Sequence, residues 1–569
     1  MPTLDWIGKR AVVNHHRELP YRLLHCDPNL GAGDPAAGNL VVEGDNLQSL
    51  KALLPYYAGR VKCIYIDPPY NTGNEGWVYN DNVNAPEIQK WLGDTVGKEA
   101  EDLSRHDKWL CMMYPRLALL REFLAEDGAI FISLDDNEFA NARLILDEVF
   151  GGQNFIGTII WQKKYSPQND AEFLSTMHDY ILVYARSTAR WKRNLVPRTE
   201  KQDKAYKNPD KDPRGVWKPS DLTRAEHRDR DYYGIVTPSG KEVFPARGRS
   251  WSRPKDEIAR LIADNRLWFG TRGDAIPSLK RFLTEVKEGV VPTTIWLRED
   301  AGDNQEAKQE IKGIFQESTF STPKPTSLIR RILQLATNPG DLILDSFAGS
   351  GTTGHAVLAL NAEAKAAHTE STEDTEKKQA ADKADLFPSS VPSASSVCDP
   401  LPPRRFILCE MEPKIARDIT AERLRRVIAG YGETPGLGGG FRFCTLGEPM
   451  LDADARFHPD VKWRDLGHHL WFAETGEPLE RMKDEGGSKK DGGSLLGVAR
   501  DGRAIYLLAG NLPGSPAGAG NALTPEALAQ FAPHDGPRVV YAEACTLRTT
   551  TLTRERIVFK QIPYQVRQQ

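Results

Sequence analysis

The sequence predicts an α/β fold built on a mostly parallel sheet. Residues 39–46 form a short apolar run that ends in an acidic turn, and residues 47–57 carry leucines at helical spacing before a second apolar run at 63–66. A strand, a helix and a strand in this order are typical of a βαβ unit. Residues 341–345 form a further apolar run, followed by a glycine turn and a helical pattern. Several of these strands end in an acid, and ligands bind at the carboxyl ends of strands in open α/β sheets.

The composition is that of an ordinary globular chain. Its 569 residues leave room for about two to four domains with cores of their own. Hydrophobic residues make up 40% and charged residues 27%, which indicates neither a disordered nor a fibrous protein. The formal net charge of −4 means that the whole chain is no polycation, so a surface for nucleic acid must be local.

Cysteine usage and the chain start bear on the compartment. The 7 cysteines include no CxxC pair and no Cys/His cluster at metal spacing, so we expect no metal site, no disulfide framework and a reducing compartment. The first residues, MPTLDWIGKR, lack the apolar core of a signal peptide. No apolar run approaches the ~18–20 residues of a membrane span. These patterns predict a cytoplasmic protein with no membrane partner.

Further elements complete one side of the predicted sheet. Helical spacing marks residues 108–126 and 137–150, and apolar runs mark strands at 128–134, 155–161 and 180–184. Residues 71–107 are polar throughout and directly follow Tyr70. A loop this long is usually functional or mobile, so we expect either a lid or a plain surface excursion.

The first candidate site is Asp67-Pro68-Pro69-Tyr70 at the end of the strand 63–66. The two prolines end the strand because proline cannot donate to a ladder. The carboxylate and the carbonyl after it can accept hydrogen bonds from an exocyclic amino group, and the tyrosine ring can stack on a base. This arrangement suits an adenine taken out of the duplex. The alternative interpretation is a proline turn that closes a strand with a structural aspartate.

The second candidate site is the glycine turn at 346–354, with Gly349 and Gly351. It lacks the Gly-Lys-Ser/Thr ending of a Walker loop and the third glycine of a dinucleotide fingerprint. Glu410 ends the next strand, 405–410, where an acid is placed to bind ribose hydroxyls. A nucleoside ligand without a pyrophosphate site fits S-adenosylmethionine better than NAD.

A basic stretch separates the two sites. Residues 186–253 carry 18 Lys and Arg against 9 Asp and Glu, with aromatic side chains interleaved. Such a mixture suits phosphate neutralisation with base contacts. The alternative is a solvated, loop-rich insertion whose aromatics form a small core of their own. The candidate DNA-binding residues are Arg186, Arg190, Lys192, Arg193, Arg247, Arg249 and Arg253.

The later chain contains a low-complexity segment at 362–403, rich in Ala, Glu, Lys, Ser and Pro. It cannot bury enough apolar surface to offset its ordering entropy, so we expect a disordered or loosely helical insertion. A helix is predicted at 415–429 and a hinge at 436–440. Residues 441–569 contain strand-like runs and no catalytic motif.

The two motifs together resemble the amino-methylating DNA methyltransferases. The carriers are Ile66-Asp67-Pro68-Pro69-Tyr70-Asn71-Thr72-Gly73 and Asp345-Ser346-Phe347-Ala348-Gly349-Ser350-Gly351-Thr352. The catalytic motif precedes the cofactor motif, an order that resembles the β class. Stretches at 43–47, 157–163, 178–185, 320–325 and 441–449 resemble the modification subunits of type III restriction systems.

This resemblance implies a doubly wound, Rossmann-like methyltransferase fold with a mostly parallel, seven-stranded sheet. It also implies an inserted target-recognition domain and a C-terminal α+β extension. The implied organisation is an N-terminal segment at 1–38, a catalytic half at 39–185, a target-recognition domain at 186–315, a cofactor half at 316–435 and a C-terminal domain at 436–569.

The resemblance also assigns roles to single residues. It implies that Asp67 and Tyr70, with Pro68 and Pro69 of the same motif, bind the target adenine. The implied S-adenosylmethionine contacts are Asp345, Phe347, Gly349, Ser350, Gly351, Thr352 and Glu410, with Thr322 and Lys324 on the methionine side and Asp45 at the adenine.

The implied activity is transfer of a methyl group to adenine N6 in double-stranded DNA, as part of a prokaryotic restriction-modification system. The implied location is the cytoplasm, in association with the nucleoid through DNA. A homodimer is expected, and a restriction (helicase-nuclease) subunit is a candidate partner. Cytosine-N4 methylation stays open, although Asp before Pro-Pro-Tyr favours adenine. Two other classes stay open as well: an inactive DNA-binding specificity subunit, and a nucleotide-dependent oxidoreductase, against which the missing third glycine counts.

Overall fold

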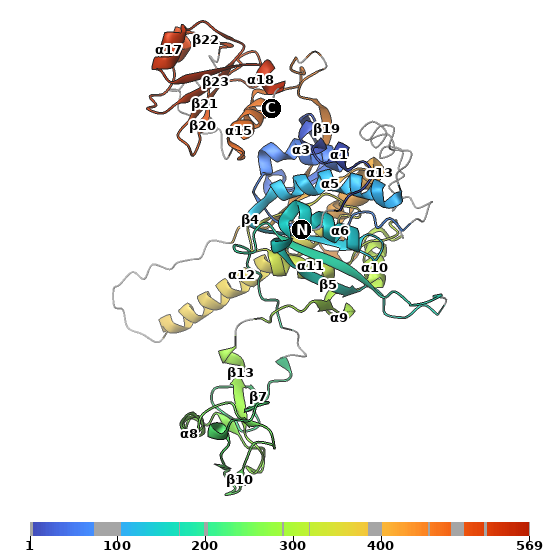
Figure 1. Ribbon diagram of the computed structural model, residues 1–569, viewed down its shortest axis with the longest axis vertical. Helices are drawn as coiled ribbons and strands as arrows, with labels where there is room; N and C mark the ends of the chain where they lie inside the picture. Colours follow the sequence, from blue (N-terminus) through green and yellow to red (C-terminus); the bar gives the residue numbers. More distant parts are fainter. Residues whose placement is uncertain are drawn as a thin grey trace. The chain divides into compact units, whose positions relative to one another are not determined.

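Figure 1 shows a computed structural model of the chain as a ribbon. The structure describes residues 4–72, 104–169, 171–198, 203–286, 289–317, 319–384, 401–452, 454, 456–479, 494–516 and 520–567. It divides into two compact units, of which unit 1 comprises Met1–Arg193 and Thr293–Gln569, and unit 2 comprises Asn194–Pro292. Within the described ranges, no helix is long and apolar enough to cross a membrane.

Unit 1 is organised around a ten-stranded sheet with the order β1-β19-β2-β16-β15-β3-β4-β6-β5-β14. The strands are β1 (Arg22–Gly33), β2 (Leu40–Glu43), β3 (Val61–Ile66), β4 (Leu124–Leu134), β5 (Phe155–Gln162), β6 (His178–Ala185), β14 (Ile295–Trp296), β15 (Leu342–Asp345), β16 (Arg405–Glu410) and β19 (Gly440–Pro449). The five neighbours from β2 to β4 run parallel, and β6 is antiparallel to both β4 and β5. The predicted doubly wound, mostly parallel fold is confirmed. The expected seven strands are extended by β1 and β19 at one edge and β14 at the other.

Helices cover both faces of this sheet because its central strands are apolar on both faces. In β3, Ile64 and Ile66 pack into one core cluster, whereas Cys63 and Tyr65 pack into the other. The first cluster includes α3 (Asn46–Tyr57), α5 (Arg105–Phe123) and α6 (Phe139–Leu146). The second includes α10 (Asn304–Phe315), α11 (Thr326–Ala336), α12 (Thr352–Ala384) and α14 (Glu422–Ala429). Strands buried on both faces in this way are typical of parallel sheets in α/β proteins.

The strand order reverses at β15, which lies between β16 and β3. The chain runs from β15 outward to β16, while β3, from much earlier in the chain, pairs with its other side in parallel. The carboxyl ends of β3 and β15 therefore meet at one edge of the sheet. Such a switch point is where open α/β sheets bind ligands.

The unit boundaries differ from those expected. The inserted unit is narrower than the predicted 186–315, because β14 pairs in parallel with β5 and α10 packs into the main core. The predicted boundary at 436 is also displaced, because β19 is a strand of the main sheet beside β2. Beyond it lies a second sheet in the order β20-β21-β23-β25. Its elements are β20 (Leu495–Val498), β21 (Ala504–Leu508), β23 (Arg538–Ala542) and β25 (Ile557–Gln561), with helix α15 (Trp463–Thr475) before them.

Unit 2 has a small core of its own. It contains α8 (Lys255–Ala263) and a three-stranded sheet of β12 (Leu267–Trp268), β13 (Ser278–Phe282) and β7 (Trp217–Asp221). The side chain of Trp251 is fully buried in its hydrophobic cluster, and its indole donates to the carbonyl of Tyr233 at 2.8 Å. Trp217 is buried as well. At least these two aromatics of the basic stretch stabilise the unit. This agrees with the alternative interpretation, in which the aromatics form a small core of their own.

Two predicted segments have a partial outcome. Helix α12 continues to Ala384, so the first half of the low-complexity insertion at 362–403 is helical. Residues 385–400 lie outside the described residues. Of the predicted loop at 71–107, residues 73–103 lie outside them too, so its role as a lid stays a prediction.

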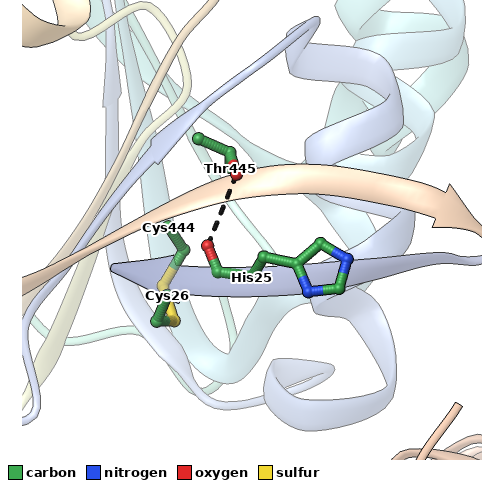
Figure 2. The surroundings of a disulfide bond; sticks show 4 residues. All are labelled: His25, Cys26, Cys444 and Thr445. Carbon is green, nitrogen blue, oxygen red and sulfur yellow. Dashed lines mark hydrogen bonds between the residues drawn. A yellow bond between two sulfur atoms is a disulfide. The ribbon is translucent and has the colours of Figure 1, made fainter. Parts of the chain in front are cut away.

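The N-terminal segment belongs to the sheet, and it carries a disulfide that was not expected. Strand β1 pairs antiparallel with β19, and Cys26 stands opposite Cys444. The two cysteines are joined by a disulfide although they are 418 residues apart in the sequence. Figure 2 shows the bond between these neighbouring strands, next to a hydrogen bond from the Thr445 hydroxyl to the His25 carbonyl. No cysteine spacing indicates this pairing, because the register of β1 against β19 brings the two side chains together.

Candidate functional site

The turns after β3 and β15 open into one cavity of about 410 Å³. The segment before α11 forms a third side of it. The predicted site residues that line the cavity are Asp67, Pro68, Pro69, Tyr70, Thr322, Lys324, Asp345, Phe347, Gly349, Ser350 and Thr352. Two motifs that lie far apart in the sequence therefore share one cavity, at the reversal of strand order.

The Asp67 carboxylate has two unlike oxygens. Its Oδ2 accepts a hydrogen bond from the Lys324 ammonium at 2.5 Å. Its Oδ1 is buried and has no hydrogen-bond partner among the described residues. Burial raises the pKa of Asp67, and the Lys324 charge opposes that rise. A buried acceptor without a partner is costly, so Oδ1 is suited to receive a donor from a ligand.

The Tyr70 ring is held by its hydroxyl. That hydroxyl donates to Asp179 Oδ2 at 3.3 Å, and Asp179 Oδ1 accepts from the Lys163 ammonium at 2.5 Å. Asp179 lies in β6 and Lys163 directly follows β5, so two neighbouring strand ends orient the ring. Both residues line the cavity, and neither was predicted as a site residue. Their sequence signal was present, since each lies in a stretch that resembles the family, but no local pattern indicated that they face Tyr70.

The proline turn is braced from the helical layer. The indole nitrogen of Trp109, in α5, donates to the carbonyl of Pro69 at 2.7 Å. Trp109 is fully buried, so this contact is shielded from water. The carbonyl of Pro69 is thereby occupied within the chain, and the rigid turn keeps a defined position at the end of β3.

The glycine turn is held by buried acids. Asp345 accepts from the Phe347 amide at 3.0 Å and from the Thr353 hydroxyl at 2.6 Å, and burial raises its pKa to about 7. Glu410 accepts from the Gly349 amide at 2.8 Å. Gly351 has φ of +76°, and a Cβ there would lie 3.2 Å from the Thr420 carbonyl oxygen. Glycine is needed at this position for both reasons.

Three predicted cofactor residues do not line the cavity with the others: Gly351, Glu410 and Asp45. Gly351 shapes the turn through its backbone, as described above. Glu410 lies behind the glycine turn, where its second oxygen accepts from the Glu412 amide at 3.0 Å. Asp45 caps α3 by accepting from the Gln48 amide, and it forms an ion pair with Arg116 at 2.9 Å. Their proposed ligand contacts stay predictions, while the structure gives each of them a clear role in holding the backbone.

A buried arginine that sequence reasoning missed joins these elements. Arg423 in α14 is fully buried, and burial lowers its pKa to about 10. Its guanidinium donates to the Thr352 hydroxyl at 2.8 Å and to the Thr326 hydroxyl at 3.1 Å. It also lies 3.4 Å from a carboxylate oxygen of Glu310, which is its counter-ion. One side chain thus connects the glycine turn to the start of α11.

The candidate DNA-binding residues fall in both units. Arg186, Arg190, Lys192 and Arg193 lie in unit 1, and Arg247, Arg249 and Arg253 lie in unit 2. Arg186 donates to the carbonyl of Arg121 at 2.6 Å, which is a structural contact. Arg249 forms an ion pair with Asp221, and Arg253 with Glu257. These pairs are partly exposed, so they are weak and open to exchange.

The fold and the paired turns define an α/β protein with a ligand cavity at its topological switch point. A family model described as DNA methylase matches residues 61–422, and the chain belongs to this family.

Curated relatives agree with this membership. The Mod subunit of the type III restriction-modification enzyme StyLTI from Salmonella typhimurium is 38% identical over 63% of this chain and 56% of its own length. The EcoP15I Mod subunit from Escherichia coli is 31% identical over 63% of this chain and 62% of its own length. The type II methyltransferase M.KpnI from Klebsiella pneumoniae is 29% identical over 58% of this chain and 79% of its own length. The chain therefore spans little more than half the length of the Mod subunits.

Proposed function

We propose that this chain is a DNA methyltransferase that transfers a methyl group from S-adenosylmethionine to the N6 amino group of an adenine flipped out of duplex DNA. The observation that carries the proposal is that Asp67 and Tyr70 share one cavity with the glycine turn of Gly349. One wall offers an acceptor and a ring for a base, and the other offers a glycine turn for a nucleoside. Membership of the DNA methylase family supports the same conclusion.

The cavity residues fit the proposed cofactor. Lys324 supplies a cation for a carboxylate, and Phe347 supplies an aromatic face. The buried acids Asp345 and Glu410 bind the backbone of the glycine turn, which lets that backbone approach a ligand closely. S-adenosylmethionine, when bound, supplies a methyl group on a positively charged sulfur.

The chain's own residues perform the remaining steps. Tyr70 stacks on the base plane, and its hydroxyl contact with Asp179 fixes the ring orientation. Asp67 Oδ1 accepts a hydrogen bond from the amine and directs the lone pair of nitrogen away from the carboxylate. When the amine nitrogen takes the methyl group, the bond from the methyl carbon to sulfur would break and its electron pair would stay on the sulfur. Positive charge would build on the nitrogen, and the Asp67 carboxylate would stabilise it and take up the released proton.

The wider assignment rests on the relatives. Two of them are type III Mod subunits, so we propose that the chain modifies DNA in a restriction-modification system, as a homodimer in the cytoplasm of a prokaryotic cell and with a restriction subunit as a further partner. The basic unit 2 is our candidate for the target-recognition domain, in agreement with its local excess of positive charge. M.KpnI carries a type II name, so a stand-alone methyltransferase is the alternative.

The test is direct. The chain is incubated with duplex DNA and S-adenosylmethionine labelled in the methyl group, and the DNA is digested to nucleosides. We expect labelled N6-methyladenosine in its deoxy form, and sequencing with modified-base detection gives the recognition site. Labelled N4-methylcytosine instead would correct the base, and DNA binding without any transfer would support an inactive specificity subunit.

A further inference from the structure

The part of the cavity beside Asp67 and Tyr70, which the proposed function assigns to the target amine, is filled by the Lys324 side chain. The Lys324 ammonium donates to Asp67 Oδ2 and lies 5.0 Å from the centre of the Tyr70 ring. An ammonium is an N–H donor, as the amino group of a base is. Lys324 therefore contacts the same carboxylate and the same ring that the proposed function assigns to the target base. Its side chain is only 11% exposed, so the ammonium lies inside the cavity and not in solvent.

The backbone of Lys324 belongs to the other half of the site. Its carbonyl accepts from the Thr352 hydroxyl at 3.1 Å, and Thr352 is held in turn by Arg423 at 2.8 Å. The backbone of Lys324 is thus anchored at the glycine turn, while its ammonium reaches Asp67 and Tyr70. The other two lysines that line the cavity bind elsewhere: Lys163 binds Asp179, and Lys164 binds the side-chain carbonyl of Gln168.

Two electrostatic requirements conflict at Asp67. Without a ligand, the partly buried carboxylate needs a counter-ion, and Lys324 provides it. During transfer, positive charge develops on the amine nitrogen, and a second cation on the same carboxylate opposes that charge. The ion pair that stabilises the empty site therefore works against the reaction. Lys324 must leave Asp67, and it needs another anion to receive it.

We propose that the Lys324 ammonium exchanges between Asp67 and the carboxylate of the cofactor, so that cofactor binding opens the subsite for the target amine. This inference rests on the proposed function, because it takes the cofactor to carry an amino-acid carboxylate. It makes Lys324 a positioning residue that couples the two halves of the cavity. Cofactor and base then bind with positive cooperativity, which is a coupling between two sites and therefore reciprocal.

The first experiment needs no DNA. Binding of two probes is measured by calorimetry: sinefungin, which has the amino-acid carboxylate, and 5′-methylthioadenosine, which lacks it. The Asp67→Asn variant removes the competitor for Lys324, so we expect it to bind sinefungin about tenfold more tightly and 5′-methylthioadenosine with unchanged affinity. The unchanged probe also reports that the variant is folded.

A double-mutant cycle separates exchange of Lys324 from the plain loss of a negative charge. In the Lys324→Met background, Asp67→Asn is expected to leave sinefungin affinity unchanged, because no ammonium is released. The proposal is overturned if Asp67→Asn fails to tighten sinefungin, or tightens it equally in both backgrounds. If neither probe binds any of the chains, the proposed function has failed instead.

The second experiment follows the base. A duplex with the mapped recognition site carries 2-aminopurine at the target adenine, and its fluorescence reports unstacking. We expect sinefungin to raise the fluorescence of the complex several-fold and 5′-methylthioadenosine to leave it low. In the Lys324→Met variant the fluorescence is expected to be high with either probe. Equal fluorescence with both probes in the parent chain contradicts the coupling.

Discussion

At the scale of single residues, Asp67 is the centre of the site. It is the carboxylate that ends β3, it has a buried oxygen without a partner among the described residues, and it pairs with the lysine of the opposite wall. Its neighbours Tyr70 and Asp179 extend the same network. The chemistry therefore depends on a few side chains whose positions the surrounding fold determines.

For Asp67→Ala we expect methyl transfer to fall below detection, while cofactor affinity is no weaker than in the parent chain. The reason is that the carboxylate serves the amine, whereas the cofactor contacts lie at the glycine turn. Labelled methyl transfer and calorimetry with sinefungin measure the two quantities. The matched control is Asp127→Ala, which removes an exposed partner of Lys62. A collapse of cofactor affinity in Asp67→Ala would show that the two turns do not divide the work in this way.

For Asp179→Asn we expect kcat/KM for DNA to fall by about 10- to 100-fold, because the Tyr70 ring loses the charged acceptor that orients it. The Kd of sinefungin is expected to stay the same. Steady-state kinetics with varied DNA checks the first value. The control is Asp136→Asn, a similar pair in which the exposed Asp136 accepts from the Tyr180 hydroxyl at 2.8 Å outside the cavity. Equal losses in the two variants would argue against a specific role for Asp179.

At the scale of elements, the glycine turn depends on α14. The Arg423 guanidinium reaches the turn at Thr352 and the start of α11 at Thr326. A buried charge of this kind is costly to leave half-paired. The position of the turn therefore depends on contacts with α14, and the sequence of the turn itself does not indicate these contacts.

We expect Arg423→Met to lower the free energy of unfolding by about 2–4 kcal/mol, because the buried Thr352 and Thr326 hydroxyls lose their donor and Glu310, whose side chain is 24% exposed, loses its counter-ion. Denaturation by urea, followed by tryptophan fluorescence, measures this change. The control Arg425→Met in the same helix removes a partly exposed pair with Glu422 and is expected to cost less than about 1 kcal/mol. A small effect in Arg423→Met would mean that the network is not needed for stability.

The buried His469 in helix α15 is expected to make the stability of the fold depend on pH. Burial lowers the pKa of His469 to about 4, below its ordinary value of 6.5, and its ring packs against Tyr21 at 4.3 Å. The unfolded chain binds a proton first, so stability is full above pH 6.5 and falls as the pH drops towards 4. The loss from this residue is on the order of 3 kcal/mol.

The measurement is the urea midpoint at several pH values between 7 and 4. In His469→Phe we expect a shallower fall than in the parent chain, because the titrating group is gone. His227→Phe, at an exposed side chain of unit 2, serves as the control and is expected to keep the parent slope. Parallel curves for the parent chain and His469→Phe would contradict the assignment.

At the scale of the whole molecule, the cavity and three of the candidate DNA-binding arginines lie in different units. The cavity is built entirely from unit 1, and unit 2 has its own core and carries Arg247, Arg249 and Arg253. This division agrees with the proposed function, in which unit 1 transfers the methyl group and unit 2 is the candidate for target recognition.

Replacing these three arginines of unit 2 by alanine is expected to weaken DNA binding and to reduce the slope of log Kd against log salt by about 2 to 3, because each phosphate contact contributes roughly 0.9. Sinefungin binding is expected to be unchanged. Fluorescence anisotropy at several salt concentrations gives the slope. The control Arg260→Ala removes another exposed arginine of unit 2, which pairs with Asp256. An unchanged slope in the triple variant would exclude these residues from the DNA contact.

Much of the fold could be predicted because its signals are local. The run 405–410 reads as a strand from its own residues and is β16, and the run 504–508 is β21 in the same way. The Pro-Pro turn ends its strand because proline cannot donate to a ladder, and the Gly-x-Gly turn allows the backbone conformation that precedes its helix. The short, late strand β14 and the membership of β1 and β19 in the main sheet were missed, because a sheet edge is decided by distant partners.

The sequence by itself determined the two turns, the parallel strands that carry them and the family to which the chain belongs. These features follow from proline, glycine and apolar patterns that act within a few residues. Only the tertiary structure decided that Lys324 pairs with Asp67, that Asp179 orients Tyr70 and that Arg423 holds the glycine turn. The physical reason is that burial and charge pairing depend on which strands become neighbours, and strand order is a property of the whole sheet.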